Sequence, residues 1–589
     1  MIKTKTCQNC KTKFAIEPED FKFYEKIGVP APTFCPECRL QRRLAFRNEM
    51  SLHKRKCDAT GKNVISIYNP KSPHKVYDHK YWWSDKWDTL EYGQDYNFNK
   101  PFFEQFKKLF LRVPQIAILT DDSAVNSDYC NSTIYAKDCY LVSMSAWVEN
   151  SFYSNRITYC KDSLDLYITD KSELCYECLY CFDSYKLFFS SHCHSCVESY
   201  FLYDCRHCQN CFGCANLRHK KYHIFNEPYS KEEYFRKLKE FNLDSYKNLI
   251  KQKQNCQEIY KKAIHRFAQI TKSVNSIGNE LKNTKNCFYA FDIKNGEDCK
   301  FINWGGYGVK DVYDSGPGFG GIAELLYEVV DTGLEGAKSF FTLVSWHNHN
   351  VQYCIQCHSS SNLFACIGLR HKQYCILNKQ YTKEQYNELV PKIIEHMNKI
   401  PYVDKKGRIY KYGEFFPIEL SPFAYNETIA NEYFPLTKEQ AKKQGYNWYD
   451  KPKAEYKPTI KAKDLPNNIK DVDSDILKEV IECDSKQCAG SGVFRIIPQE
   501  LKFYKKMNLP LPRLCPDCRH RERIKQRNPL KLWERQCQCA GTHSDNKTYE
   551  NTIEHKHKDK HCPNKFQTTY APTRKEIVYC EKCYLKEVG

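Results

Sequence analysis

The chain has 589 residues, 41% hydrophobic and 27% charged, which excludes a disordered protein and predicts several folded domains. Its 90 Lys and Arg against 71 Asp and Glu give a formal net charge of +19, which invites a polyanionic partner. The chain has 33 cysteines but neither an apolar signal sequence nor the ~18-residue apolar run that a membrane helix needs. We therefore expect a cytoplasmic protein without membrane contact, whose cysteines bind metal or fill cores.

The two ends of the chain carry the same motif. VPAPTFCPECRLQRRLAFRNE begins at Val29, and LPLPRLCPDCRHRERIKQRNP begins at Leu509. At a constant numbering offset of 480, the prolines, the cysteine pair and an Arg-Asn pair match without a gap. We therefore expect duplicated modules over residues 1–60 and 476–536.

Each terminal module contains two cysteine pairs. They are Cys7-x2-Cys10 with Cys35-x2-Cys38, and Cys483-x4-Cys488 with Cys515-x2-Cys518. Two pairs of thiolates, the second pair opening a helix, are typical of a treble-clef zinc site. A site of four thiolates leaves no open coordination position, so we expect structural Zn²⁺. The alternative is that these cysteines are merely buried.

Residues 537–589 hold a further half-site, Cys580-x2-Cys583, which predicts a C-terminal zinc ribbon. Cys562 is the best third ligand, and we assign Cys539 as the fourth. The alternatives for the fourth position are Cys537, which matches Cys57 in the terminal repeat, and four histidines: His543, His555, His557 and His561.

The N-terminal half contains a degenerate copy of this ribbon over residues 61–117. ISIYNPKSPHKVYDHKYWW aligns with QTTYAPTRKEIVYCEKCYL, which places Asp78 and Tyr81 where the C-terminal copy has Cys580 and Cys583. Asp and Tyr do not replace two thiolates at a zinc site. We expect a metal-free ribbon that packs through Tyr81, Trp82 and Trp83, followed by a helical connector.

The central region is also repeated. CANLRHKKYHIFNEPYSKEEYFRKL from Cys214 matches CIGLRHKQYCILNKQYTKEQYNELV from Cys366. Shorter Cys/aromatic repeats begin at Cys160, Cys181, Cys196 and Cys211. Strands with period-two alternation, repeated at such short intervals, predict two β-solenoid-like units over 118–228 and 280–380. Capping boxes predict that helices follow each unit.

The expected fold is multidomain, β-rich α+β, with small treble-clef or zinc-ribbon modules at both ends of a duplicated β-solenoid-like core. Three further segments complete the predicted organisation. They are capping and connecting helices over 229–279, capping helices over 381–448, and a flexible Lys/Pro-rich linker over 449–475.

The cysteines of the central repeats permit two interpretations, a metal cluster or a column of small buried residues. Serine and cysteine interchange at equivalent repeat positions, which favours the column, because a metal ligand would not alternate with serine. The best exceptions are Cys205 with Cys208, and Cys354 with Cys357 and His358.

The motif C-x2-C-x3-F-x6-F-x-FY-x-K-x3-P-x-P-x2-CPxCR resembles the bacterial probable zinc-ribbon (treble-clef) domain family. With EIVYCEKCYLKEV near the other end, the arrangement is similar to multi-zinc proteins of candidate-phyla bacteria. The resemblance covers the stretches 1–60 and 480–540. It implies zinc binding at the cysteines of both terminal modules but no known activity, and the Cys483-x4-Cys488 spacing departs from the family pattern.

Each CPxCR motif is followed by a stripe of arginines on the predicted helix. These are Arg39, Arg42, Arg43 and Arg47 in the first copy and Arg519, Arg521, Arg523 and Arg527 in the second. Like charges one helical turn apart destabilise a helix, so the stripes need a physical reason. Guanidinium groups suit phosphate, which predicts contact with RNA or DNA. The alternative is that the arginines balance the thiolate zinc centre and neighbouring carboxylates.

The sequence thus predicts a non-enzymatic zinc scaffold that binds RNA or DNA. One alternative is a zinc-stabilised protein-interaction scaffold. Another is a β-solenoid enzyme, for which His347 and His349, near Cys354 and Cys357, are candidates for metal binding or acid–base catalysis, although no carboxylate partner is assignable.

Overall fold

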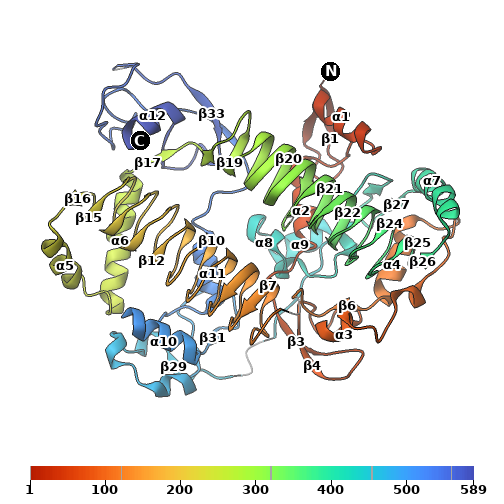
Figure 1. Ribbon diagram of the computed structural model, residues 1–589, viewed down its shortest axis with the longest axis horizontal. Helices are drawn as coiled ribbons and strands as arrows, with labels where there is room; N and C mark the ends of the chain where they lie inside the picture. Colours follow the sequence, from red (N-terminus) through yellow and green to blue (C-terminus); the bar gives the residue numbers. More distant parts are fainter. Residues whose placement is uncertain (1, 121–122, 319–320, 453–455, 559) are drawn as a thin grey trace. The chain divides into compact units, whose positions relative to one another are not determined.

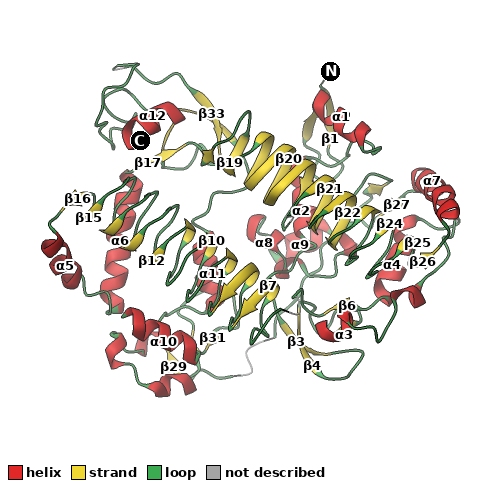
Figure 2. Cartoon of the chain, in the orientation of Figure 1, coloured by secondary structure: helices red, strands yellow, loops and turns green. Residues whose placement is uncertain are grey.

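The computed structural model describes the whole chain except residues 1, 121–122, 319–320, 453–455 and 559. The described residues form an α+β structure rich in strands (Figure 2). They divide into two compact units, each assembled from separate stretches of the chain. Unit 1 comprises Met1–Leu119, Ala268–Tyr449 and Leu530–Leu532, and unit 2 comprises Thr120–Phe267, Asp450–Pro529 and Trp533–Gly589. Each unit thus combines one terminal module with one central repeat. The sequence predicted the segments one after another along the chain and did not predict this combination.

Unit 2 is built on a stack of short parallel strands. Tyr167 pairs with Leu179, and Tyr185 pairs with Val197 in the same way. The chain therefore returns to the same face at this regular interval, and we call one such turn a coil. The strands of this stack are β7 (Asn131–Lys137), β8 (Ser143–Glu149), β9 (Asn155–Thr158), β10 (Tyr167–Asp170), β11 (Leu179–Phe182), β12 (Tyr185–Phe188), β13 (Val197–Tyr200), β14 (Gln209–Phe212) and β15 (Lys221–Ile224), with β16 (Glu227–Pro228) antiparallel to β15.

The coils turn a corner at every third residue. Non-glycine residues at the corners adopt left-handed backbone, for example Tyr135, Asp138 and Leu141 with φ of 52°, 53° and 51°. This conformation costs an L-residue about 1–2 kcal/mol, so the inter-coil hydrogen bonds and the buried interior must offset it. Side chains face the interior at every third position, which differs from the predicted period-two alternation.

Cysteine, serine and leucine fill the interior of the unit 2 stack. Cys175, Cys178 and Cys181 are fully buried at successive third positions. The Cys178 thiol lies within hydrogen-bond distance of two carbonyl oxygens, that of Tyr176 just before it (3.5 Å) and that of Leu187 on the next coil (3.2 Å). Serine hydroxyls at these positions also donate to the carbonyl two positions before them, as Ser163 does. This shared bond is a physical reason why the two residue types interchange.

Helices and small sheets complete unit 2. Helix α5 begins at the predicted capping box of Ser230 and Glu233. Part of the predicted flexible linker is ordered, since Leu465, Ile469 and Val472 are buried in a core with Phe494 and its neighbours. The remaining elements are α5 (Lys231–Glu240), α6 (Tyr246–Lys262), β17 (Ile264–Arg266), β29 (Ile460–Lys461), β30 (Ile481–Glu482), β31 (Val493–Phe494), α10 (Pro498–Met507), α11 (Pro516–Ile524), β32 (Trp533–Gln536), β33 (Lys565–Thr568), β34 (Ile577–Tyr579) and α12 (Glu581–Val588).

Unit 1 contains a second stack of parallel strands, drawn as successive green rungs in Figure 1. Its repeat is less regular, because the interval from Val309 to its partner Ala323 is longer than that from Ala337 to its partner His349. The strands are β18 (Ile270–Thr271), β19 (Ile277–Lys282), β20 (Lys285–Ser315), β21 (Ala323–Thr332), β22 (Gly336–Ser345), β23 (His349–Gln352), β24 (Ser361–Phe364), β25 (Gln373–Ile376) and β26 (Lys379–Gln380).

The N-terminal module and several helices pack against this second stack within unit 1. The helices of unit 1 are α1 (Pro18–Lys26), α2 (Pro36–Leu44), α3 (His79–Trp83), α4 (Phe102–Arg112), α7 (Lys383–Lys399), α8 (Ile429–Tyr433) and α9 (Lys438–Gln444), of which α1, α2, α4 and α7 share a core with the stack. The short strands are β1 (Lys3–Thr6), β2 (Lys13–Ile16), β3 (His53–Lys56), β4 (Asn63–Ser66), β5 (Val76–Tyr77), β6 (Gln115–Ile116), β27 (Tyr402–Val403) and β28 (Ile409–Tyr410). None of the helices in the described part of the chain combines the length and apolar character needed to cross a membrane.

The segment predicted as a metal-free ribbon shares one backbone contact with its C-terminal counterpart. The backbone N–H of Asp78 donates to the Cys57 sulfur at 3.2 Å, as that of Cys580 does to Cys537 in the C-terminal copy. The Asp78 carboxylate instead caps α3, and Trp82 is fully buried with its indole N–H bonded to the Pro114 carbonyl.

Candidate metal centres

The first candidate metal centre lies in the N-terminal module. Cys7, Cys10, Cys35 and Cys38 place their four sulfur atoms within 4.8 Å of one another. The sulfurs of Cys10 and Cys35 are 3.6 Å apart, close to the edge of about 3.8 Å expected for a tetrahedron with metal–sulfur bonds of about 2.3 Å. Cys35 is the N-cap of α2, so the second pair sits at the first turn of this helix, as predicted.

The second centre repeats this geometry in the C-terminal module. Cys483, Cys488, Cys515 and Cys518 form an equivalent group, with the Cys488 sulfur 3.5 Å from that of Cys515 and 3.7 Å from that of Cys518. The wider Cys483-x4-Cys488 spacing therefore still brings four thiols together. The backbone N–H of Ala489 donates to the Cys518 sulfur at 3.2 Å, a contact that favours a thiolate there.

The third centre, in the C-terminal ribbon, differs from the predicted one at a single position. Cys562, Cys580 and Cys583 are joined by Cys537 rather than by Cys539. The N–H of Cys580 bonds to the Cys537 sulfur at 3.2 Å, which orients that thiol toward the group. The terminal repeat already contained the signal, because Cys57 and Cys537 match at the offset of 480.

A fourth group adjoins the third. Cys539 lies within 4.8 Å of His555, His557 and Cys583, so Cys583 belongs to both groups. Two of the histidines that the sequence offered as alternatives therefore lie here, whereas His543 and His561 belong to neither group among the described residues.

The cysteines of the coils join none of these four groups in the described part of the chain. Burial raises the pKa of Cys130 and of Cys160 to about 12, so these thiols stay protonated and are poor ligands. The proposed exceptions at Cys205 and Cys208 likewise donate to backbone carbonyls.

The residues predicted as candidates for an enzyme site do not lie together in one site. His347 and His349 are exposed, whereas Cys354 and Cys357 are buried in the interior of the unit 1 stack. His358 is buried beside Trp83 and Trp346, and burial lowers its pKa to about 3.

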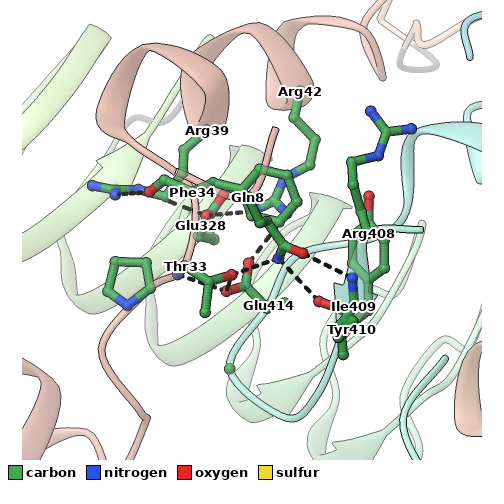
Figure 3. Close-up of polar contacts among 12 residues, drawn as sticks. Gln8, Thr33, Phe34, Arg39, Arg42, Glu328, Arg408, Ile409, Tyr410 and Glu414 are labelled. Atoms are coloured by element: carbon green, nitrogen blue, oxygen red, sulfur yellow. Dashed lines mark hydrogen bonds and ion pairs between the residues drawn. The ribbon is translucent and has the colours of Figure 1, made fainter. Parts of the chain in front are cut away.

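The arginine stripe of α2 is buried within unit 1. Arg39, Arg42, Arg43 and Arg47 are each only 1% exposed. Arg42 reaches Glu328 at 2.8 Å and Glu414 at 3.2 Å (Figure 3). Further ion pairs engage the rest of the stripe: Arg39 with Asp314 at 2.8 Å, Arg43 with Asp314 and Glu328 at 3.2 and 3.0 Å, and Arg47 with Asp331 at 2.6 Å. Apart from Glu414, these carboxylates stand on β20 and β21.

The stripe of α11 makes an equivalent set of contacts within unit 2. Asp165 of the coil stack pairs with Arg519 at 2.9 Å and with Arg523 at 2.7 Å. Arg519 also meets Glu500 at 3.1 Å, and burial raises the pKa of this carboxyl while the Arg519 charge opposes the shift. Arg527 donates to the Tyr167 hydroxyl at 2.7 Å.

This burial leaves little of the arginine stripes exposed for the predicted phosphate contact, which stays a prediction. Seven of the eight guanidinium groups face carboxylates or hydroxyls of their own unit and are shielded from solvent. The eighth, Arg521, is half-buried and donates to the Gln487 carbonyl in the Cys483–Cys488 loop. The other interpretation, charge balance with nearby carboxylates, fits what the described residues do.

One surface feature of the unit 2 stack, a column of aromatic side chains, is absent from the sequence predictions. Tyr135, Trp147 and Tyr159 lie one coil apart and are 54%, 47% and 51% exposed. Their rings stack, with centroid distances of 5.6 and 4.9 Å and interplanar angles of 17° and 8°. We call these three residues the aromatic column. Their equal spacing along the chain could have revealed it.

Neither family models nor characterised protein sequences give a match to this chain.

Proposed function

We propose that this chain is a non-catalytic, zinc-stabilised scaffold of the cytoplasm that binds a protein partner along the aromatic column. The metal is zinc, the terminal modules are treble clefs, and the two stacks of coils are β-solenoids. Each proposal is supported by a specific feature of the described residues.

Zinc is favoured by the donor sets. Three groups offer four sulfurs each, at separations that suit a tetrahedral ion, and the fourth mixes sulfur with imidazole. Zinc is the common biological ion for closed sites of this kind, whose role is to hold chain segments together. When bound, it would supply cross-links between loop and helix in the terminal modules and no open coordination position. Thiol-rich sites and solenoid interiors full of free cysteine suit a reducing compartment.

The aromatic column carries the proposal of a protein partner. Three large rings on one exposed stripe of a regular surface are typical of an interface, where Tyr and Trp are enriched. The charged residues close to the rings in sequence balance one another. There are three cations, Lys137, Arg156 and Lys161, and three carboxylates, Asp138, Glu149 and Asp162. Lys137 and Lys161 both pair with Glu149, at 3.2 and 3.6 Å. A stripe of net zero charge suits a protein better than a polyphosphate.

RNA or DNA remains the alternative partner, since the net charge of +19 still favours a polyanion. It would have to bind without the buried arginines of α2 and α11. Titration with labelled single- and double-stranded RNA and DNA at two salt concentrations tests it, because phosphate contacts give steep salt dependence.

Site-specific photo-crosslinking tests the protein partner directly. A benzoylphenylalanine in place of Trp147 should give one discrete adduct in the native host that survives nuclease and is removed by protease. The matched control places the crosslinker at Tyr185, an exposed aromatic of the same stack outside the column. Tyr135→Ala with Tyr159→Ala should weaken the adduct at position 147. A nuclease-sensitive adduct, or equal adducts at both positions, would contradict the proposal.

A further inference from the structure

Two candidate metal groups in the C-terminal ribbon share one sulfur atom. Cys583 belongs both to the group of Cys537, Cys562 and Cys580 and to the group of Cys539, His555 and His557. Its sulfur is 3.7 Å from that of Cys562 on one side and 3.5 Å from Nε2 of His557 on the other. A single thiolate thus lies where two tetrahedra of ligands meet.

The two histidines are oriented for this second group by hydrogen bonds through their other nitrogen atoms. Nδ1 of His557 lies 2.6 Å from the Lys560 carbonyl oxygen, which leaves Nε2, the atom nearest Cys583, for a metal. Nε2 of His555 lies 2.9 Å from Glu587, which leaves Nδ1. Metal-binding histidines commonly donate their second N–H to a carbonyl or carboxylate in this way.

The carboxylate that orients His555 is itself fixed. Glu587 has a fully buried side chain and accepts from the backbone N–H and hydroxyl of Thr552, both at 2.9 Å, and from the Tyr549 hydroxyl at 3.2 Å. His555 is almost fully buried as well. Burial and a fixed hydrogen-bond partner therefore distinguish His555 from a surface histidine that lies near thiols by chance.

The sulfurs of the two groups also receive amide donors. Asn551 donates to Cys539 and Asn564 to Cys580, each at 3.3 Å. Such contacts stabilise thiolates rather than thiols. A four-thiolate site and a separate site of two thiolates and two imidazoles would carry −2 in total, whereas five thiolates shared by two Zn²⁺ carry −1. Sharing Cys583 therefore lowers the charge that the ribbon must bury.

We propose that the C-terminal ribbon holds a dinuclear zinc cluster bridged by the Cys583 thiolate. One ion is bound by Cys537, Cys562, Cys580 and Cys583, and the other by Cys539, His555, His557 and Cys583. Both ions are four-coordinate and closed, so the cluster is structural. It ties the segment from Cys537 to Cys562 to the first turn of α12. This inference rests on the proposed identity of the metal as zinc.

Zinc stoichiometry of the full-length protein is the first test. Elemental analysis should give four zinc ions per chain, and the double variant His555→Ala, His557→Ala should retain three. His561→Ala is the matched control: this histidine lies in the same segment, is partly exposed and belongs to neither group, so four ions should remain. Three ions in the unmodified protein, or four in the double variant, would overturn the cluster while leaving the zinc scaffold intact. No bound zinc would overturn both proposals.

A second measurement does not depend on any variant. After replacement of zinc by ¹¹³Cd, the unmodified protein should show four cadmium resonances, two of them coupled to each other through the Cys583 sulfur. Four resonances without such a coupling would show two independent ions and contradict the bridge.

Discussion

The two terminal modules use the same motif against different parts of the chain. In unit 1, Arg39 and Arg43 both pair with Asp314, and in unit 2, Arg519 and Arg523 both pair with Asp165. These arginines correspond at the offset of 480, and each aspartate belongs to the coil stack of its own unit. In both units the duplicated helix therefore packs with two arginines against a buried aspartate of a coil.

The modules differ at two positions of the stripe, because Gln41 stands where the second copy has Arg521 and Glu522 stands where the first has Arg42. Arg42 is buried between Glu328 and Glu414, but its equivalent, Glu522, is exposed and pairs with Lys525. The first helix thus contacts two further acidic positions that the second lacks. The comparison separates the two arginines that meet one aspartate in both copies from Arg42, which is specific to unit 1.

Metal removal should have the largest effect on both modules. Structural zinc contributes about 10–16 kcal/mol in isolated zinc-binding peptides, far more than any single ion pair. Treatment with a strong chelator should abolish the protection of α2 and α11 from hydrogen exchange, measured by mass spectrometry of their peptides. Adding zinc back should restore it. Unchanged protection of both helices after complete zinc loss would contradict the structural role.

Removing the shared aspartate should come next. Asp314→Asn removes the carboxylate that Arg39 and Arg43 share and leaves Arg43 with Glu328 alone, and breaking a buried pair in this way costs about 3–5 kcal/mol. Hydrogen exchange should quicken in α2 but not in α11, and Asp165→Asn should give the reverse pattern. The control is Glu297→Gln, whose pair with Lys285 is exposed, and which should leave both helices unchanged. Equal effects on both helices from either variant would contradict separate docking.

Acidification should weaken unit 1 through His358. Its pKa is about 3 in the folded state because it is buried, below the ordinary 6.5, so the unfolded chain takes up the proton first. The contribution of His358 to the free energy of unfolding is then fully present above about pH 6.5. It falls by about 1.4 kcal/mol per pH unit as the pH drops toward 3. Unfolding followed by Trp fluorescence between pH 7 and 5, with zinc in excess, should show that the free energy of unfolding falls less steeply in His358→Phe than in the unmodified protein. Parallel curves would show that His358 does not contribute.

The smallest effect is expected inside the coils. Cys178→Ser should cost about 1 kcal/mol or less, because a serine hydroxyl can make the same bond to the carbonyl two positions earlier. Thermal unfolding should move by a few degrees at most. Cys35→Ser, by comparison, removes a candidate metal ligand and should cost one bound zinc. A Cys178→Ser variant that fails to fold would show that the coil cysteines do more than fill space.

The sequence predicted part of this architecture correctly. The strand-rich α+β class is confirmed, and cysteine groups do occur in both terminal modules. The solenoid and treble-clef assignments stay predictions. The predicted period of two residues is wrong, because the coils turn at every third residue. Interior cysteines of a coil therefore recur in C-x2-C spacing, as Cys175 and Cys178 do, although they belong to none of the candidate metal groups among the described residues.

The role of the arginines could not be predicted from local sequence. Their partners lie far along the chain, since Asp314 is in the second central repeat and Arg39 in the first module, and Asp165 and Arg519 are similarly remote. A stripe of arginines looks the same whether it faces phosphate or a buried aspartate, and only the tertiary structure distinguishes the two. The fourth ligand of the ribbon, by contrast, was implicit in the match between Cys57 and Cys537.

A double-mutant cycle tests the central claim, that the arginines dock the modules onto the coils. It combines Arg39→Met with Asp314→Asn and measures the free energy of local opening of α2 at about 0.1 M and at about 1 M salt, the second being strongly screening. The account predicts a coupling energy of about 2 kcal/mol that persists at high salt, because the pair is buried. A coupling below about 0.5 kcal/mol, or one that disappears at high salt, would show solvent-exposed arginines that are free to contact phosphate.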